Sequence, residues 1–256
     1  MGVLWSPDES GRVAMNPPWI TALKKEFTAE LRAKQGITTS GLFGLMAVAA
    51  CGFASSIEKP GPGLAAGLLS VILLFVSTVA IPRIFIAEQE QGTFDLYRQW
   101  ASPTAIFLGK LLFAAAQMIL ISLMVGAIYV AMVAPELKIP WLYWVGTILF
   151  GIAASNVLCI AGSLVMGAAN RWILAGVISL PLTFPLVFMG VGLLRVAFGE
   201  GTLNGGFINL IGLLGYAIAP IGLGPFLAES LWNEANTEDR KGLQGQGATE
   251  SQWEGR

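Results

Sequence analysis

Six long apolar segments dominate the sequence, and each is about as long as a membrane-spanning helix. They cover residues 37–56, 64–86, 106–134, 141–168, 172–198 and 206–232. A helix needs about 20 apolar residues to cross a hydrocarbon layer about 30 Å thick. Backbone groups in lipid must bond within their own segment, and these segments show no strand-like alternation of apolar and polar residues. The pattern predicts an all-α membrane protein with six transmembrane helices, which together form a domain over residues 36–232.

A shorter amphipathic segment over residues 18–35 precedes the first span. Two consecutive prolines suit the start of a helix, where a missing N–H is no loss. Large apolar residues then recur every four positions, with charged side chains between them: Trp19, Leu23, Phe27 and Leu31. This pattern is typical of a helix that lies in the membrane interface. Such a helix serves either as a plain anchor or as a lever between a partner protein and the bundle.

The two ends of the chain are polar. Residues 1–17 lack the apolar core of a cleavable signal peptide, so we expect a polar N-terminal segment. Residues 233–256 hold scattered charges and Gly-Gln-Gly repeats, with too little apolar content to pack. We expect this tail to be disordered.

Composition supports a membrane protein and excludes several kinds of chemistry. The chain is 55 % hydrophobic and 12 % charged, with a mean hydropathy of +0.68, whereas soluble domains carry about 25 % charge. It has no histidine, which excludes a Ser-His-Asp triad, an imidazole zinc site and a histidine ligand to haem. The two cysteines, Cys51 and Cys159, lie inside apolar segments and suggest no disulfide framework. We therefore expect no catalytic residue and no metal site in this chain.

The basic residues are distributed unequally between the two sides of a six-span topology. Twelve of the fifteen lie on the side of the two termini, and only Lys59, Lys138 and Arg195 lie on the other. Lysine and arginine favour the cytoplasmic side of a membrane. We therefore predict a multi-pass protein of the bacterial cytoplasmic (inner) membrane with both termini in the cytoplasm.

The loop between the second and third spans mixes charged and aromatic residues. Its candidate contact residues are Arg83, Glu88, Glu90, Gly92, Asp95 and Arg98. Aromatic anchors with charges that set the register are typical of a surface that binds another protein. A solvated interfacial loop remains an alternative, whereas acid–base catalysis lacks an accompanying nucleophile or ligand set. Lys110 lies one turn inside the third span, where we expect its long side chain to reach back to water.

The fifth and sixth spans contain helix-breaking residues. Pro181 and Pro185 in the fifth, and Pro220 and Pro225 in the sixth, remove backbone donors and are expected to kink their helices. They indicate either a hinge or re-entrant portion over residues 199–216, or static kinks. Two polar residues in mid-span, Gln117 and Asn156, are expected to form hydrogen bonds between helices.

Several segments resemble the CcmB family, the haem exporter B permeases of cytochrome c maturation. The similar segments are Lys24-Lys25-Glu26-Phe27-x-x-Glu30-Leu31-Arg32-x-Lys34, Glu88-x-Glu90-x-Gly92-Thr93-Phe94, Ala101-Ser102-Pro103, Ile106-Phe107-Leu108-Gly109-Lys110 and Leu180-Pro181-Leu182-x-x-Pro185-Leu186. Phe94 stands where the family usually has leucine. The resemblance runs from Trp19 to about Trp232 and covers most of the chain.

The resemblance implies an ABC-2-like permease subunit of an ATP-binding-cassette complex. Its implied partners are a CcmA-like ATPase, a CcmC-like haem-handling membrane protein, a CcmD-like small subunit and a CcmE-like haem chaperone. ATP would bind the ATPase, because the sequence has no Gly-x-x-x-x-Gly-Lys-[ST] motif. No cofactor is expected to bind this chain directly, and haem is a possible substrate. Residues 83–103 would then contact the ATPase. The alternatives are an ABC-2 exporter subunit for lipid or drug and a non-transporting scaffold.

Overall fold

The computed structural model describes residues 17–33, 35–81, 84, 102–134, 136–165 and 171–227. These residues form one short helix and six helices long and apolar enough to cross a membrane, which confirms the predicted all-α fold with six spans. The helices are α1 (Pro18–Ala33), α2 (Gln35–Ala54), α3 (Pro62–Ala80), α6 (Pro103–Met132), α7 (Pro140–Leu164), α8 (Arg171–Ala197) and Leu203–Leu227, which we call the last helix.

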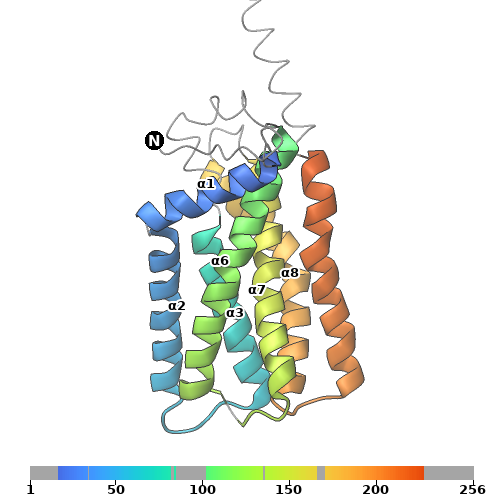
Figure 1. The fold of residues 1–256 in the computed structure, drawn as a ribbon. Coiled ribbons are helices and arrows are strands. Elements are labelled where there is room, and N and C mark those ends of the chain that lie inside the picture. The colour runs from blue at the N-terminus through green and yellow to red at the C-terminus, as the bar shows by residue number, and fades with distance from the viewer. Residues whose placement is uncertain are drawn as a thin grey trace, which may run out of the picture.

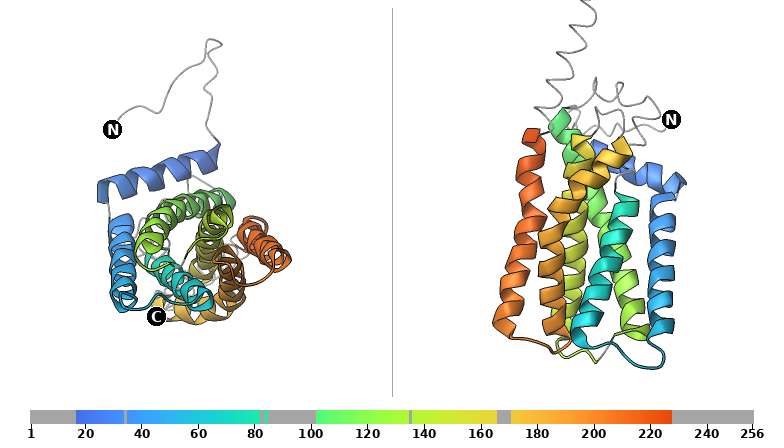
Figure 2. Two further views of the ribbon diagram at one scale, coloured as in Figure 1. Left: turned by 90° about the horizontal axis from the view of Figure 1, so that it is seen from below. Right: turned by 180° about the vertical axis from the view of Figure 1, so that it is seen from behind.

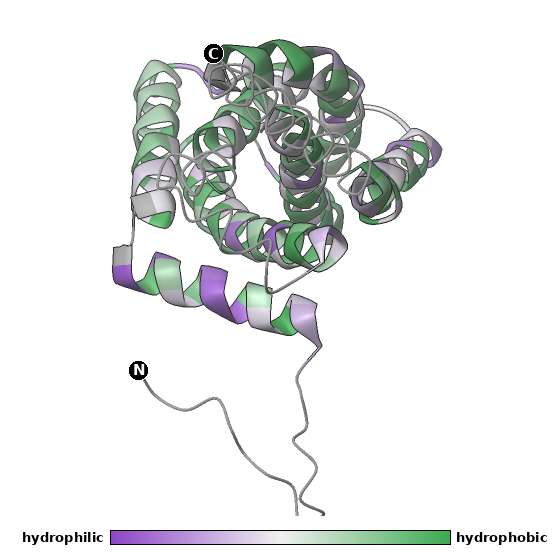
Figure 3. Cartoon of the chain, turned by 90° about the horizontal axis from the view of Figure 1, so that it is seen from above, coloured by the Kyte–Doolittle hydropathy of each residue, from purple (hydrophilic) through white to green (hydrophobic). Residues whose placement is uncertain are grey.

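The spans run side by side, and α1 crosses one end of the bundle (Figure 1). The central span is α7: 72 % of its most apolar window is buried, against 28 % for α2 and 22 % for the last helix. Figure 2 shows these last two at opposite edges of the bundle. Seen from the α1 end, the spans are predominantly hydrophobic, while α1 alternates hydrophilic and hydrophobic residues (Figure 3). Large apolar side chains of the spans, such as Phe53, Phe75 and Phe188, are more than half exposed. The bundle therefore presents the apolar surface that a lipid bilayer requires.

Local sequence explains where several helices begin. Pro62, Pro103 and Pro140 each stand in the first turn of their helix, where no N–H donor is needed. Ser102 caps α6, because its hydroxyl accepts a hydrogen bond from Ala105 N at 3.3 Å. Only one residue, Lys34, separates α1 from α2. The direction of α1 is therefore fixed directly against the first span.

Three buried side chains join the central helices through hydrogen bonds to backbone carbonyls. Tyr129 Oη of α6 donates to Ala65 O of α3 at 2.7 Å, and Tyr143 Oη of α7 donates to Gly126 O of α6 at 2.8 Å. Asn156 Nδ2 of α7 donates to Ala217 O of the last helix at 2.7 Å. The predicted role of Asn156 is thus confirmed. These bonds connect α3, α7 and the last helix to one another through the middle of the bundle.

The prolines of the fifth and sixth spans do not end their helices. Pro181 and Pro185 lie inside α8, which continues from Arg171 to Ala197. Thr183 Oγ1, between them, donates to Ser179 O at 2.9 Å and supports the same turn. Pro220 and Pro225 likewise lie within the last helix. The hinge interpretation of these four residues stays a prediction.

The re-entrant interpretation of residues 199–216 is wrong. The chain leaves α8 through a short turn at residues 198–202, and the last helix begins at Leu203. Gly199 and Gly201 adopt φ values of +95° and +115°, which only glycine accepts readily, so the turn can be this tight. Ala197 O accepts hydrogen bonds from Lys138 N and Ile139 N at 3.1 and 3.0 Å. The chain reverses its direction within residues 198–202. Residues 203–216 therefore belong to the last helix and form no re-entrant segment.

We expect substitution of Asn156 by leucine to weaken attachment of the last helix. The loss removes one interhelical hydrogen bond, worth about 1 kcal/mol in a membrane protein. Thermal unfolding of the purified protein in mild detergent measures the change. The matched control is Ser155→Ala, because Ser155 Oγ donates to Ile152 O of its own helix at 2.8 Å. Equal stability of the two variants would contradict this assignment.

Candidate functional site: the junction of α1 and α6

One face of α6 carries the contacts with α1 and with the start of α2. Gly109, Phe113 and Gln117 follow one another at four-residue steps, so they lie on one side of the helix. Gly109 lies against Ala22 of α1, and the Phe27 and Phe113 rings meet edge to face with centroids 5.1 Å apart. The first four turns of α6 therefore position α1 across the end of the bundle.

The absence of a side chain at Gly109 permits this close approach. A Cβ atom at Gly109 would lie 2.6 Å from Ala22 Cβ, 3.1 Å from Leu23 N and 3.2 Å from Trp19 O. Two of these three atoms belong to the backbone of α1, which cannot rotate away as a side chain can. The conformation of Gly109 is ordinary helix, so its requirement here is for space rather than for an unusual φ.

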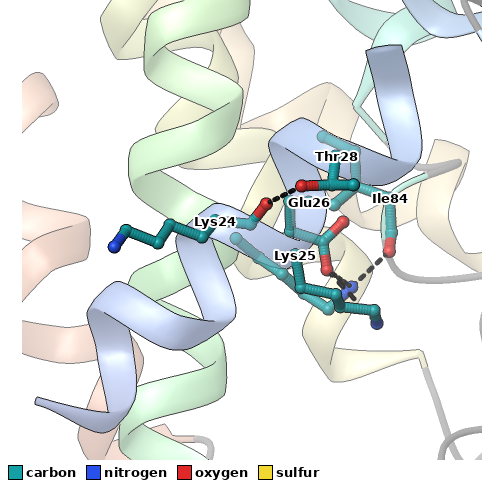
Figure 4. A network of polar contacts seen from close by, with 6 residues as sticks. Lys24, Lys25, Glu26, Thr28 and Ile84 are labelled. Atoms are coloured by element: carbon teal, nitrogen blue, oxygen red, sulfur yellow. Dashed lines mark hydrogen bonds and ion pairs between the residues drawn. The ribbon is translucent and has the colours of Figure 1, made fainter. Parts of the chain in front are cut away.

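Lys110 forms a buried ion pair with α1, and the expectation that its side chain reaches water is wrong. Its side chain is 1 % exposed, and Nζ lies 3.1 Å from Glu26 Oε1. Nζ also donates to Ile84 O at 2.7 Å, four residues after the end of α3 (Figure 4). The physical reason is that α1 covers the path to water that this side chain would take. One ammonium group therefore joins α6, α1 and the chain at Ile84.

The carboxylate of Glu26 has a second cation beside it. Lys25 Nζ lies 3.7 Å from the same Oε1 atom, and its side chain is 36 % exposed. The Glu26 side chain is 11 % exposed, so its charge is largely removed from water. A buried charge of this kind is tolerated when it is paired and hydrogen-bonded. At this junction, the Glu26 carboxylate therefore lies beside two basic side chains, the buried Lys110 and the partly exposed Lys25.

Glu30, one turn after Glu26, attaches α1 to the start of α2. Its Oε1 atom accepts a hydrogen bond from Ile37 N at 2.8 Å, which satisfies one of the free N–H groups in the first turn of α2. A Cβ at Gly36 would lie 3.0 Å from Glu30 Oε2 and 3.1 Å from Gln117 Nε2. The amide of Gln117 is thus close to the Glu30 carboxylate, although its Nε2 atom has no hydrogen-bond partner among the described residues.

The four apolar residues predicted for the amphipathic helix lie on α1, but they are not its most buried positions. Ala22 and Glu26 are buried against α6, whereas Trp19, Phe27 and Leu31 are 38, 41 and 68 % exposed. The side packed on protein is therefore rotated from the apolar stripe. The stripe itself is largely open to the surroundings of the bundle, which suits a helix at a membrane surface.

The predicted loop residues Arg83, Glu88, Glu90, Gly92, Asp95 and Arg98 lie outside the described residues. The structure places the points that flank this loop, Ile84 and Ser102. Ile84 is bonded to Lys110, and Ser102 caps the helix on which Lys110 stands. One described end of the loop is therefore bonded to the Lys110 side chain, and the other lies at the start of the same helix, α6.

Sequence reasoning missed Glu26 and Glu30 as inward-facing residues. It counted both among the polar positions of an amphipathic helix, where glutamate normally faces water. The available signal was Lys110, because a lysine inside an apolar span needs an anionic partner if water is excluded. The sequence did not identify the partner, because Glu88, Glu90 and Asp95 lie much nearer to Lys110 along the chain than Glu26 does.

The arrangement is suited to holding helices together rather than to catalysis. It contains an ion pair, a helix cap and a ring contact, with no nucleophile placed beside a base. No group of three or more His, Cys, Asp or Glu side chains in the described part of the chain could hold a metal ion. In this membrane protein, the amphipathic helix α1 is therefore fixed to the first turns of α6, the third span.

With an amphipathic helix before six spans, the chain has the architecture of a multi-pass membrane protein. The family model for CcmB protein matches residues 19–231, which covers α1 and all six spans. The chain belongs to the CcmB family and is a membrane permease of cytochrome c biogenesis, a transporter component rather than a catalytic enzyme. None of the curated proteins matches the chain.

Replacement of Gly109 by leucine is expected to displace α1. The added side chain would meet the α1 backbone at distances shorter than packed atoms adopt. Hydrogen exchange over residues 18–33 measures the effect, because a displaced helix loses protection. Gly67→Leu on α3 is the matched control, since a Cβ there meets no atom within 4 Å. Unchanged protection in the Gly109 variant would refute the close approach.

The stability cost of breaking the ion pair is expected to depend on which partner is removed. Glu26→Leu removes the Glu26 carboxylate from beside the buried ammonium of Lys110 and should cost about 3–5 kcal/mol. Lys110→Met should cost less, because Lys25 stays beside Glu26. The double variant should recover most of the loss, since no buried charge is then left unpaired.

Thermal unfolding of the three variants in one detergent checks this order. Lys138→Met is the surface control, because Lys138 and Glu136 form an exposed pair that should contribute at most about 1 kcal/mol. A double variant less stable than either single variant would contradict the explanation.

Proposed function

We propose that this protein couples ATP hydrolysis by a separate CcmA-like subunit to movement of the membrane domain. The output of that movement is haem export or release of the haem-loaded chaperone. The observation that carries the proposal is the junction at Lys110, which joins Ile84, at the start of the 83–103 loop, to α1. A loop anchored in this way can deliver force to a helix instead of moving alone. Membership of the CcmB family supplies the context of an ATP-binding-cassette complex.

The ATPase contact lies on the 83–103 loop in this proposal. Its acidic residues Glu88 and Glu90 and its basic residues Arg83 and Arg98 would set the register of docking, while Gly92 permits a local bend. The charge asymmetry of the sequence supports a cytoplasmic position for this loop and for both termini. The ATPase would then meet the bundle at the α1 end.

The remaining partners would act around the membrane domain. A CcmC-like haem-handling protein and a CcmD-like small subunit would lie beside it in the bilayer, and a CcmE-like chaperone would receive haem on the far side. Met118 lies in the apolar core, where its sulfur accepts a hydrogen bond from Ser77 Oγ at 3.7 Å, so it acts as a packing residue. This chain would therefore transmit movement, and Met118 would not serve as a haem ligand.

The double charge reversal Glu88→Lys with Glu90→Lys is expected to abolish binding of the ATPase. Opposed like charges at an interface cost several kcal/mol, and each 1.4 kcal/mol is about tenfold in affinity. Co-purification of the ATPase with the full chain in mild detergent should therefore fall by at least about tenfold. Lys138→Met, at the opposite end of the bundle, is the control and should leave recovery unchanged. Undiminished recovery with the reversed charges would refute the assignment of this loop.

A further inference from the structure

The loop between α2 and α3 lies at the end of the bundle opposite α1 (Figure 1). The last turn of α2, this loop and the first two turns of α3 enclose a cavity of about 430 Å³. We propose that the cavity binds a phospholipid with an ethanolamine headgroup. This lipid site is separate from the junction at Lys110 and does not depend on the proposed function.

The lining of the cavity is apolar on the helices and charged in the loop. It consists of Cys51, Ala54, Ser55, Glu58, Lys59, Pro60, Gly61, Leu64 and Leu68. The helix residues Cys51 and Leu68 lie within the spans, whereas the two charged residues lie beyond the ends of both helices. The cavity therefore extends from the apolar layer of the bundle to its polar boundary.

The side chains around the cavity are open to the surroundings of the bundle. Phe53 and Leu64 are more than half exposed, and Ile57 in the loop is 98 % exposed. Such large apolar side chains are covered by lipid in a membrane protein. A ligand that reaches the cavity from the bilayer is thus apolar at one end, where it meets Leu64 and Leu68, and polar at the other.

The two charged residues of the lining have opposite signs. Glu58 and Lys59 are consecutive and both are exposed, so the cavity offers a carboxylate and an ammonium group together. A long hydrogen bond of 3.5 Å from Lys59 Nζ to Ala134 O holds the ammonium near the end of α6. An ammonium has three N–H donors, so this bond leaves donors for a second acceptor.

This pair of charges selects the headgroup. A phosphate would accept hydrogen bonds from Lys59, and a primary ammonium beside it would donate to Glu58. An ethanolamine phospholipid carries both groups next to each other, on acyl chains that match the apolar lining. A choline headgroup has no N–H to donate, and a glycerol headgroup has no positive charge. The volume of the cavity lies in the range of small-molecule sites, about 300–1,000 Å³.

Native mass spectrometry of the full chain tests the inference. The protein is purified in mild detergent and offered equal amounts of dioleoyl phospholipids with ethanolamine, choline or glycerol headgroups. We expect one ethanolamine lipid per chain to be retained in preference to the others. The preference should be about fivefold, as expected for one additional ion pair at a partly exposed site.

The chain offers a matched control for each charge. Glu58→Gln should remove the preference for ethanolamine, and Lys59→Met should lower retention of all three lipids. Glu136→Gln and Lys138→Met are the controls, because this exposed pair lies at the same end of the bundle but outside the lining. Both controls should retain the ethanolamine lipid as the unmodified chain does.

Gly61→Leu tests the cavity itself rather than its charges. Gly61 belongs to the lining, its φ of −61° suits any residue, and a Cβ there meets no atom within 4 Å. The variant should therefore fold, occupy the space and lose the preference. Gly67→Leu on α3 is the control, because its Cβ is equally open but lies outside the lining.

Cys51 provides a second readout in the unmodified chain. It is one of only two cysteines and belongs to the lining, whereas Cys159 is buried. A bound lipid should slow the modification of Cys51 by a maleimide, and the ethanolamine lipid should slow it more than the choline lipid. Intact mass measures the rate, and Cys159 should stay unmodified throughout.

Three outcomes would overturn the inference. The first is equal retention of the three lipids, with Cys51 modified at one rate in all of them. The second is a preference for ethanolamine that survives Glu58→Gln, Lys59→Met and Gly61→Leu. The third is retention of a peptide or another small molecule in place of a phospholipid. All three leave the proposed function intact, and failure to retain the ATPase would refute that function without affecting this site.

Discussion

The arrangement at the α1 end depends on one buried charge. An ammonium group withdrawn from water must be paired, and Lys110 is paired by bringing Glu26 and the carbonyl of Ile84 to the same point. This requirement explains why a short polar helix leaves water to pack against a transmembrane helix. It also explains the glycine immediately before the lysine, since the ion pair forms only if the two helices approach closely. The close approach of α1 to α6 and the pairing of Lys110 with Glu26 therefore both follow from the burial of one ammonium group.

Among the described residues, side-chain hydrogen bonds join α3, α6, α7 and the last helix to one another. Tyrosine and asparagine side chains bond to carbonyls across the central helices, where each unpaired polar group would be costly. At one edge of the bundle, α2 packs against α6 through glycines that face apolar side chains, and only one residue connects it to α1.

The sequence predicted the spans well because the hydrocarbon core imposes one length and one composition on them. Residues 106–134 were expected as the third span, and α6 covers Pro103–Met132. The amphipathic stripe likewise located α1. The junction was harder to predict because the pairing of Glu26 with Lys110 joins residues 84 positions apart. Helical periodicity gives the face of each residue on its own helix, and it contains no information on which helix lies opposite.

The separation of Glu26 and Lys110 along the chain has a consequence for biogenesis. The amphipathic helix is synthesised long before the lysine that neutralises its carboxylate, and two membrane spans lie between them. Until α6 has been synthesised, α1 lacks the helix against which Ala22 and Glu26 are buried. The Glu26–Lys110 ion pair can therefore form only after the third span, α6, has been synthesised.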